Sequence, residues 1–167
     1  MHHIRRQLTL FIPADQSIII EDIRRKYNPE QYQLIKSHIT LCREDELRDI
    51  TLIKQNLASQ IFKGIVLSLE SAKRFSEGKG VLIPVIDNNG EFQSLRREIL
   101  KEVIDNPRLH EPHITLMHPR NSTCTDDIFE EIRKKQLPSV IRFDTISLIE
   151  QSNGGAWKIL DEYALKE

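Results

Sequence analysis

The chain of 167 residues is 39% hydrophobic and 29% charged, which is ordinary for a globular protein of one domain. Its formal net charge of -1 argues against a protein that coats long nucleic acid through charge alone. No apolar run is long enough to cross a membrane, and two cysteines are too few for a disulfide framework, so we expect a reduced, cytoplasmic protein.

Strand-like and helix-like patterns alternate through the first half of the chain. Strands are indicated by apolar residues at every second position, and helices by apolar residues three and four apart, such as Ile19, Ile20 and Ile23. The expected elements are a strand over 6–12, a helix over 15–27, a strand over 33–42, a helix over 45–60 and a strand over 64–75.

The second half of the chain repeats this order. The expected elements are a strand over 81–86, a turn or helix start at 87–90, a helix over 92–104, a strand over 111–118, a helix over 125–135 capped by Thr125, and a long strand over 140–151. A turn at Asn153-Gly154-Gly155 then leads into a last strand over 156–160.

One four-residue phrase, HITL, occurs in both halves. It stands at His38–Leu41 and again at His113–Leu116, which is a shift of 75 residues. The same shift carries Arg6 onto Val81, so the phrase belongs to a repeated unit and is not an isolated coincidence.

The repeat predicts the fold class. We expect a single domain over 1–167, built as two lobes over roughly 6–75 and 81–150, with the strand over 156–160 completing a sheet. The class is α+β: a bilobal pseudo-two-fold duplication with two mainly antiparallel sheets, flanked by helices around a central cleft.

The repeated phrase is half apolar and half polar. Side chains alternate along a strand, so His38 and Thr40 point one way while Ile39 points the other, and His113 and Thr115 behave in the same manner. Two lobes related by a two-fold axis would therefore bring two histidines and two threonines into one cleft.

Two histidines and two threonines suit the cleavage of a phosphate diester. A neutral imidazole can deprotonate a water molecule while an imidazolium on the opposite side protonates the departing alkoxide. The threonine hydroxyls can donate to the non-bridging oxygens. This chemistry calls for no metal and no cofactor.

At these residues the chain resembles the 2H phosphoesterase superfamily, whose mark is a pair of H-x-[ST]-x motifs. It looks most like the branch of 2′-5′ RNA ligases and RNA 2′,3′-cyclic phosphodiesterases. The resemblance implies a metal-free phosphodiesterase that opens 2′,3′-cyclic phosphates to 2′-phosphates. It implies that His38 is the acid and His113 the base, and that Thr40 and Thr115 bind the phosphate.

The substrate stays open among several kinds. Relatives open ADP-ribose 1″,2″-cyclic phosphate, cleave 2′,5′-linked oligonucleotides, or join RNA ends. The short, nearly neutral chain favours a nucleotide, a cyclic-phosphate nucleotide or an RNA terminus as partner, bound by a monomer. Two other classes are a non-catalytic module that binds nucleotides or RNA ends, and a metalloprotein using His110, His113 and His118.

Five further residues are candidates for substrate binding. Arg43 and Arg120 follow the two motifs and can reach phosphate or ribose. Phe11, at the end of the first strand, can stack on a base. Phe75 and Lys79, in a basic loop, can stack on a base and attract phosphate. Continued alternation from His113 places His118 on the opposite face unless the strand ends near Met117, and we expect a loop histidine and not a catalyst.

Overall fold

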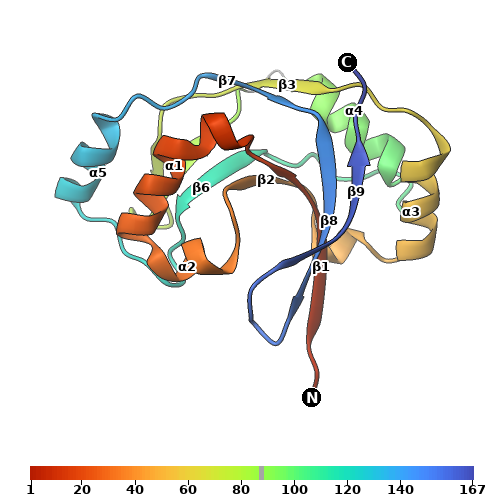
Figure 1. Cartoon of the computed structure of the whole chain (residues 1–167), viewed down its shortest axis with the longest axis horizontal. Coiled ribbons are helices and arrows are strands. Elements are labelled where there is room, and N and C mark those ends of the chain that lie inside the picture. Colours follow the sequence, from red (N-terminus) through yellow and green to blue (C-terminus); the bar gives the residue numbers. More distant parts are fainter. Residues whose placement is uncertain (87–88) are drawn as a thin grey trace.

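The computed structural model describes residues 1–86 and 89–167. The expected turn or helix start at 87–90 thus lies partly outside the described residues. The elements in chain order (Figure 1) are β1 (Ile4–Phe11), α1 (Ala14–Tyr27), α2 (Pro29–Leu34), β2 (His38–Cys42), η1 (Glu44–Glu46), α3 (Ile50–Ser59), β3 (Ile65–Ser68), β4 (Lys73–Phe75), β5 (Gly80–Pro84), α4 (Gly90–Ile99), β6 (His113–Met117), α5 (Asp126–Arg133), β7 (Val140–Phe143), β8 (Thr145–Ser152) and β9 (Lys158–Ala164).

The strands form two antiparallel sheets, which confirms the predicted α+β class. The larger sheet has the order β4-β5-β6-β2-β1-β8-β9, and β3 pairs with β7 in the smaller one. The two-lobe repeat predicts one sheet in each lobe, and this is wrong, because both lobes contribute to each sheet. In the larger sheet β2 of the first lobe pairs with β6 of the second, and in the smaller sheet β3 of the first lobe pairs with β7 of the second.

A pseudo-two-fold axis runs through both sheets. Where β2 meets β6, Ile39 is the partner of Ile114, and these two residues are 75 positions apart. In the smaller sheet Ile65 pairs with Phe143, and Ser68 pairs with Val140. Val140 follows Ile65 by 75 positions and Phe143 follows Ser68 by 75 positions, so the same axis relates these two pairs. The duplication is therefore expressed in strand pairing as well as in element order.

The shift of 75 does not hold for the first strand of each lobe. Leu10 pairs with Ile39, and Ile83 pairs with Ile114, so β1 corresponds to β5 with a shift of 73. The expected match of Arg6 with Val81 is wrong by two residues, because the connection to the motif strand is longer in the second lobe. An offset of two preserves which face each side chain occupies.

Two expected long strands are each split between the two sheets. The strand over 64–75 is divided into β3 and β4, and the strand over 140–151 into β7 and β8. Asp144 lies at the second crossing, where its carbonyl accepts a hydrogen bond from Leu165 N. Apolar alternation continues through both crossings, so the pattern cannot show that the chain changes sheets.

Other differences concern element ends. The first residues of the expected strand over 33–42 belong to α2, and the strand itself begins at His38. The expected helix over 45–60 is divided into η1 and α3, and the expected helix over 92–104 ends at Ile99. The last strand, expected over 156–160, is β9 over Lys158–Ala164. The cap at Thr125 is confirmed, since its side chain accepts a hydrogen bond from Ile128 N. Among the described residues, no helix is long and apolar enough to span a membrane.

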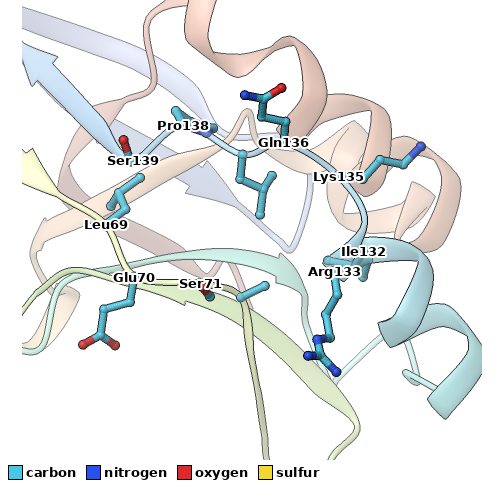
Figure 2. Close-up of a pocket in the computed structure, with 11 residues that line it drawn as sticks. Leu69, Glu70, Ser71, Ile132, Arg133, Lys135, Gln136, Pro138 and Ser139 are labelled. Atoms are coloured by element: carbon cyan, nitrogen blue, oxygen red, sulfur yellow. The ribbon is translucent and has the colours of Figure 1, made fainter.

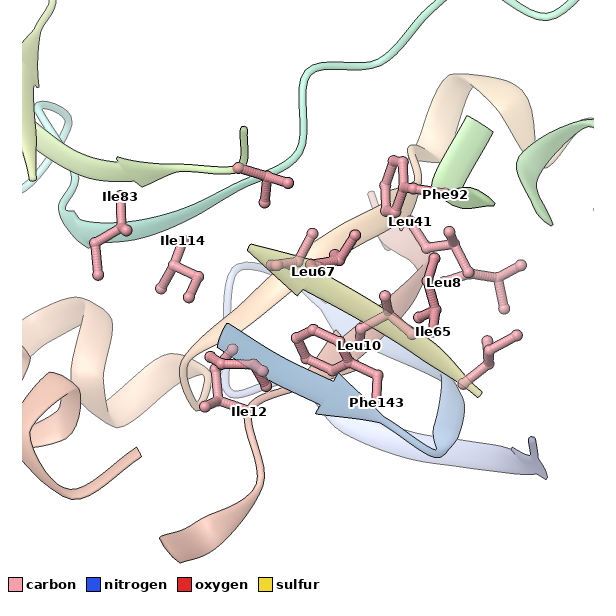
Figure 3. Packing of buried hydrophobic residues seen from close by; sticks show 14 of the residues in the cluster. Leu8, Leu10, Ile12, Leu41, Ile65, Leu67, Ile83, Phe92, Ile114 and Phe143 are labelled. Carbon is pink, nitrogen blue, oxygen red and sulfur yellow. The ribbon is translucent and has the colours of Figure 1, made fainter. Parts of the chain in front are cut away.

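The core lies between the two sheets and the helices. Figure 3 shows Ile65 and Leu67 of β3 and Phe143 of β7 packed toward Leu8 and Leu10 of β1. Helices α1, α3, α4 and α5 each add buried apolar residues to the same cluster. One face of the larger sheet is thereby covered by the core.

Candidate active site

The two motif strands have the same pattern of burial. In β2, His38 and Thr40 are partly exposed while Ile39 is buried, and the corresponding residues of β6 repeat this pattern. The predicted facing of both motifs is confirmed. We call the face of the larger sheet that carries His38, Thr40, His113 and Thr115 the motif face.

Strand pairing sets the arrangement of the four polar side chains. Because Ile39 lies opposite Ile114 in antiparallel strands, His38 lies across from Thr115, and Thr40 across from His113. Directly opposite Cβ atoms are roughly 5 Å apart, and residues two apart on a strand are separated by about 7 Å. The four side chains therefore stand at the corners of a quadrilateral of roughly 5 by 7 Å on one face of the sheet.

The first motif strand contains an extra residue. Pairing with β1 skips Leu41, so that Thr40 and Cys42 face consecutive residues of the neighbouring strand. Leu41 and Cys42 are both buried, which interrupts the alternation. Arg43 follows the end of the strand, and its side chain is 57% exposed.

The second motif strand has the same irregularity. Pairing with β5 skips Leu116, and both Leu116 and Met117 are buried. The strand ends at Met117, and His118 lies in the loop that follows, which confirms the expectation of a loop histidine.

Backbone carbonyls orient both motif histidines. Nδ1 of His38 lies 2.8 Å from the carbonyl oxygen of Lys36, and Nδ1 of His113 lies 2.9 Å from that of Glu111. A carbonyl oxygen only accepts hydrogen bonds, so Nδ1 carries the proton in each ring. Nε2 of each histidine is left to accept or donate a proton on the motif face.

The surroundings of His38 favour its neutral form. Burial lowers the pKa of His38 from 6.5 to about 4, and the charges of Arg24 and His113 act in the same direction, while the Lys36 carbonyl opposes them. Arg24 is 2% exposed and donates to the carbonyl of Ile35 at 2.6 Å. It thereby holds the segment that leads into His38.

A buried ion pair supports the second lobe. Arg96 of α4 donates to both carboxylate oxygens of Glu46 at 3.0 and 2.6 Å, to the carbonyl of Leu41 and to that of Arg108. Burial would raise the pKa of Glu46, but the hydrogen bonds from Arg96 and from the Arg43 amide lower it below its ordinary value. The pair ties the end of β2 to the segment that leads into His113.

His110 lies beside the second motif without bonding to it. Its ring stacks on Phe92 at 6.2 Å between centroids and stands 6.4 Å from the ring of His113. Burial, followed by the charge of Arg96, lowers the pKa of His110 to about 4. In residues 1–86 and 89–167, no three side chains of His, Cys, Asp or Glu are grouped as metal ligands.

Phe11 is the aromatic candidate nearest to the motifs. It pairs with His38 across β1 and β2, and the two rings meet edge to face with centroids 6.2 Å apart. The residue that pairs with His113 is Pro84. The first histidine therefore has an aromatic neighbour on the adjacent strand, and the second has a proline.

The other candidates lie farther from the motifs. Phe75 sits on the outer strand β4 with its ring against Gly80, where a Cβ would come within 2.5 Å of the ring. Lys79 is exposed in the turn between β4 and β5. Arg120 is exposed after β6, and its backbone amide donates to Nδ1 of His118.

The sequence did not reveal the buried residues that hold the motifs in place. Arg24 and Arg96 lie on helices where a charged residue is usually exposed, yet both are at most 2% exposed. Asn28 directly follows the predicted helix over 15–27, yet it is 1% exposed and its Oδ1 accepts a hydrogen bond from His118 N at 2.7 Å. A buried polar residue of this kind gives no periodic signal.

A pocket elsewhere in the molecule is separate from the motif face. Figure 2 shows that it is lined by Leu69, Glu70 and Ser71 after β3, and by residues of the connection from α5 to β7 that ends at Ser139. None of the motif residues lines it. We assign no function to this pocket.

Comparison with known proteins agrees with the motifs and the fold. The model of the 2′-5′ RNA ligase superfamily matches residues 12–155, which include both HITL phrases. No curated protein matches the sequence. The structure is similar to Escherichia coli LigT in the apo form, with a TM-score of 0.69, 18% identity and 99% of each chain covered.

Two further solved structures show the same fold. Escherichia coli LigT complexed with phosphate has a TM-score of 0.66 and 18% identity, with 98% of each chain covered. A phosphoesterase has a TM-score of 0.67 and 15% identity, with 98% of this chain and 99% of that chain covered. Because one family model spans both motif strands and the lobes around them, the chain belongs to the 2′-5′ RNA ligase superfamily of 2H phosphoesterases.

Proposed function

We propose that the protein is a phosphodiesterase that hydrolyses the 2′,3′-cyclic phosphate of a nucleotide or an RNA end to a 2′-phosphate. The observation that carries this proposal is the two-fold arrangement of His38, Thr40, His113 and Thr115, with Nδ1 of each histidine held by a backbone carbonyl. Solved complexes of the similar LigT with phosphate and with 3′-AMP support a nucleotide phosphate as the ligand.

The proposed reaction consumes one water molecule. Nε2 of His113 takes a proton from water as the water oxygen forms a bond to phosphorus. The bond from phosphorus to O3′ breaks, and Nε2 of His38 gives its proton to O3′. The hydroxyls of Thr40 and Thr115 donate to the non-bridging oxygens, where negative charge is concentrated in the transition state.

The acid role of His38 requires that it gain a proton when substrate binds. Its pKa of about 4 in the free protein leaves the ring neutral at neutral pH. A phosphate anion next to an imidazole favours the charged form and raises its pKa. We therefore propose that the phosphate of the substrate recruits the proton that His38 later donates.

Turnover of a substrate panel tests the proposed activity. Purified protein is incubated with 2′,3′-cyclic nucleotides and with RNA ending in a 2′,3′-cyclic phosphate, in the presence of EDTA, and products are identified by chromatography and ³¹P NMR. We expect 2′-phosphates from the wild type and a loss of about 10²- to 10⁴-fold in turnover for His38→Asn and for His113→Asn. Undiminished turnover by both variants would overturn the proposal.

A sulfur leaving group tests which histidine is the acid. When sulfur replaces the bridging 3′ oxygen of the cyclic substrate, the departing thiolate needs no proton. We expect His38→Asn to recover much of its lost activity on this substrate, whereas His113→Asn should not recover. Recovery by His113→Asn alone would show that the two roles are exchanged.

The same panel separates the other activities of relatives from the proposed one. Turnover confined to ADP-ribose 1″,2″-cyclic phosphate or to 2′,5′-linked oligonucleotides would identify that compound as the substrate class in place of 2′,3′-cyclic phosphates. Joining of RNA ends would identify a ligase. Tight binding of a 2′-nucleotide without turnover of any cyclic substrate would identify a binding module. We propose that a monomer suffices, since one chain supplies both motifs.

A further inference from the structure

One peptide group connects the ring of His38 to helix α1. This peptide group joins Lys36 to Ser37. Its carbonyl oxygen lies 2.8 Å from Nδ1 of His38, and its N–H, which belongs to Ser37, donates to Oε1 of Glu21 at 2.9 Å. The groups therefore form one chain of hydrogen bonds, from the carboxylate of Glu21 through the peptide group to the imidazole ring.

Glu21 is held in this position by a buried partner. Arg24, three residues farther along α1, donates to the same Oε1 at 2.7 Å and to the carbonyl of Ile35 at 2.6 Å. Arg24 and Ser37 are each 2% exposed. The hydrogen bonds at Ser37 and Arg24 are therefore shielded from water, and in such surroundings each bond has a stronger electrostatic effect on the next group.

A carboxylate at the start of this chain affects the ring at its end. Hydrogen bonds in series polarise one another, so a negative charge on the N–H side of a peptide group makes its carbonyl oxygen a stronger acceptor. A stronger acceptor at Nδ1 favours the protonated ring. Burial has the largest effect on the pKa of His38 and lowers it; among the charged groups, Arg24 of α1 and His113 of β6 also lower it, and Glu21 raises it.

The second motif lacks this connection. Nδ1 of His113 lies 2.9 Å from the carbonyl oxygen of Glu111, but the next residue is Pro112, so the peptide group between them has no N–H. A carboxylate cannot bind this peptide group in the way that Glu21 binds the first. The two motif histidines thus have matching carbonyl partners, and they differ in what holds those carbonyls.

We propose, on the basis of the function proposed above, that Glu21 is a positioning residue for His38, which acts through the Lys36–Ser37 peptide group and helps the ring to keep the proton that it gives to the leaving oxygen. This effect needs no contact between Glu21 and the substrate. The protein itself then distinguishes the acid from the base, because only the histidine that must hold a proton is connected to a carboxylate.

Two variants interrupt the chain at different points. Glu21→Gln removes the negative charge. Ser37→Pro removes the N–H and keeps the charges of Glu21 and Arg24, and it gives the first motif the Pro-His-Ile-Thr-Leu sequence of the second. In ¹⁵N-labelled protein at neutral pH, the Nδ1–H signal of His38 should move to higher field in both variants as its hydrogen bond weakens, and that of His113 should stay in place.

A pH series gives a second readout of the same variants. The pKa of His38 is measured from its ring ¹⁵N shifts, and we expect it to fall by about 1 in Glu21→Gln and by less in Ser37→Pro. Melting temperatures verify that each variant is folded. Ser37→Pro leaves Arg24 with its counter-charge, so it decides the proposal if Glu21→Gln does not fold.

Asp22→Asn is the matched control. It removes one negative charge from the next residue of α1, where the side chain is 64% exposed and pairs with Arg25. The Nδ1–H signal and the pKa of His38 should both stay at their wild-type values. A His38 ring that responds equally to Asp22→Asn and Glu21→Gln, or that responds to neither Glu21→Gln nor Ser37→Pro, would overturn the proposal.

Turnover separates this role from a merely structural one. With cyclic substrate, kcat should decline at high pH as His38 loses its proton, and in Glu21→Gln this decline should begin at lower pH. A structural role would lower kcat equally at every pH. The spectra need no substrate, so they decide the connection of Glu21 to His38 even if no cyclic phosphate is hydrolysed. Conversely, hydrolysis by the wild type with unchanged His38 spectra in both variants would remove Glu21 from the mechanism and leave the activity intact.

Discussion

Ile39 and Ile114 are direct partners at the junction of the two lobes, and both are completely buried. They are the same residue of the repeated phrase, so the pseudo-two-fold axis passes between them. The histidine and threonine on either side of each isoleucine are placed by this one contact. The stability of the fold and the geometry of the site thus depend on the same pair.

Truncation of either isoleucine should destabilise the protein. We expect Ile39→Ala and Ile114→Ala each to lower the free energy of unfolding by about 2–5 kcal/mol, because each leaves a cavity in a packed core. Val66→Ala, at a position 47% exposed on the small sheet, is the control and should cost less than about 1 kcal/mol. Denaturant titration measures the difference, and equal losses in all three variants would contradict the prediction.

Removal of one partner of the buried ion pair should also be costly. Glu46→Gln leaves the guanidinium of Arg96 buried without a counter-charge, and we expect a loss of about 3–5 kcal/mol. The exposed pair of Arg25 and Asp22 offers the comparison, since Asp22→Asn should change stability by at most about 1 kcal/mol. A Glu46→Gln variant as stable as Asp22→Asn would show that the pair contributes little.

The motif threonines should act through their hydroxyl groups. Thr40→Val and Thr115→Val keep the shape of the side chain but remove the donor, and we expect each to lower kcat by about 10²-fold. Thr40→Ser and Thr115→Ser retain the hydroxyl and should stay within about 10-fold of the wild type. If the serine and valine variants lose activity equally, the threonines act through the packing of their methyl groups and not through hydrogen bonds from their hydroxyl groups.

Acid should destabilise the protein through two histidines. The pKa values of His38 and His110 are lowered from 6.5 to about 4 in the folded state, so the unfolded chain binds more protons between these values. Stability from these groups is present above pH 6.5 and is lost as the pH falls toward 4. His110→Gln should therefore show a shallower loss of stability across this range, measured by denaturation at each pH.

Binding of phosphate should be coupled to proton uptake. If the bound anion raises the pKa of His38, affinity for inorganic phosphate increases as the pH falls from neutral toward the pKa of the free protein. Calorimetry in buffers of different ionisation enthalpy counts the protons taken up. His38→Gln should bind phosphate with less proton uptake, and an uptake identical to the wild type would assign the proton to another group.

The facing of the motifs could be predicted because it follows from the geometry of a single strand. Alternation separated His38 and Thr40 from Ile39, and the repeat indicated that a second copy would lie nearby. Two copies of one strand, related by the pseudo-two-fold axis, then bring two histidines and two threonines together. The order of elements was predictable for the same reason, since each lobe confirms the other.

What could not be predicted depends on contacts between distant segments. The residue inserted at Leu116 becomes visible only from the pairing of β6 with β5. The crossing of the chain from one sheet to the other leaves the apolar pattern unchanged. Arg96 was hidden because its partner Glu46 is 50 residues away.

A chain of half this length would build the same foursome by dimerisation, since each half carries one HITL strand and the two meet about a two-fold axis. In such a dimer every substitution would appear in both copies of the site. When the two copies are parts of one chain, each can change in sequence without the other. Phe11 beside one histidine and Pro84 beside the other, or Arg43 after one motif and His118 after the other, are differences that only a fused chain permits. An asymmetric substrate, with different groups on the two sides of its phosphate, can be distinguished only after that divergence.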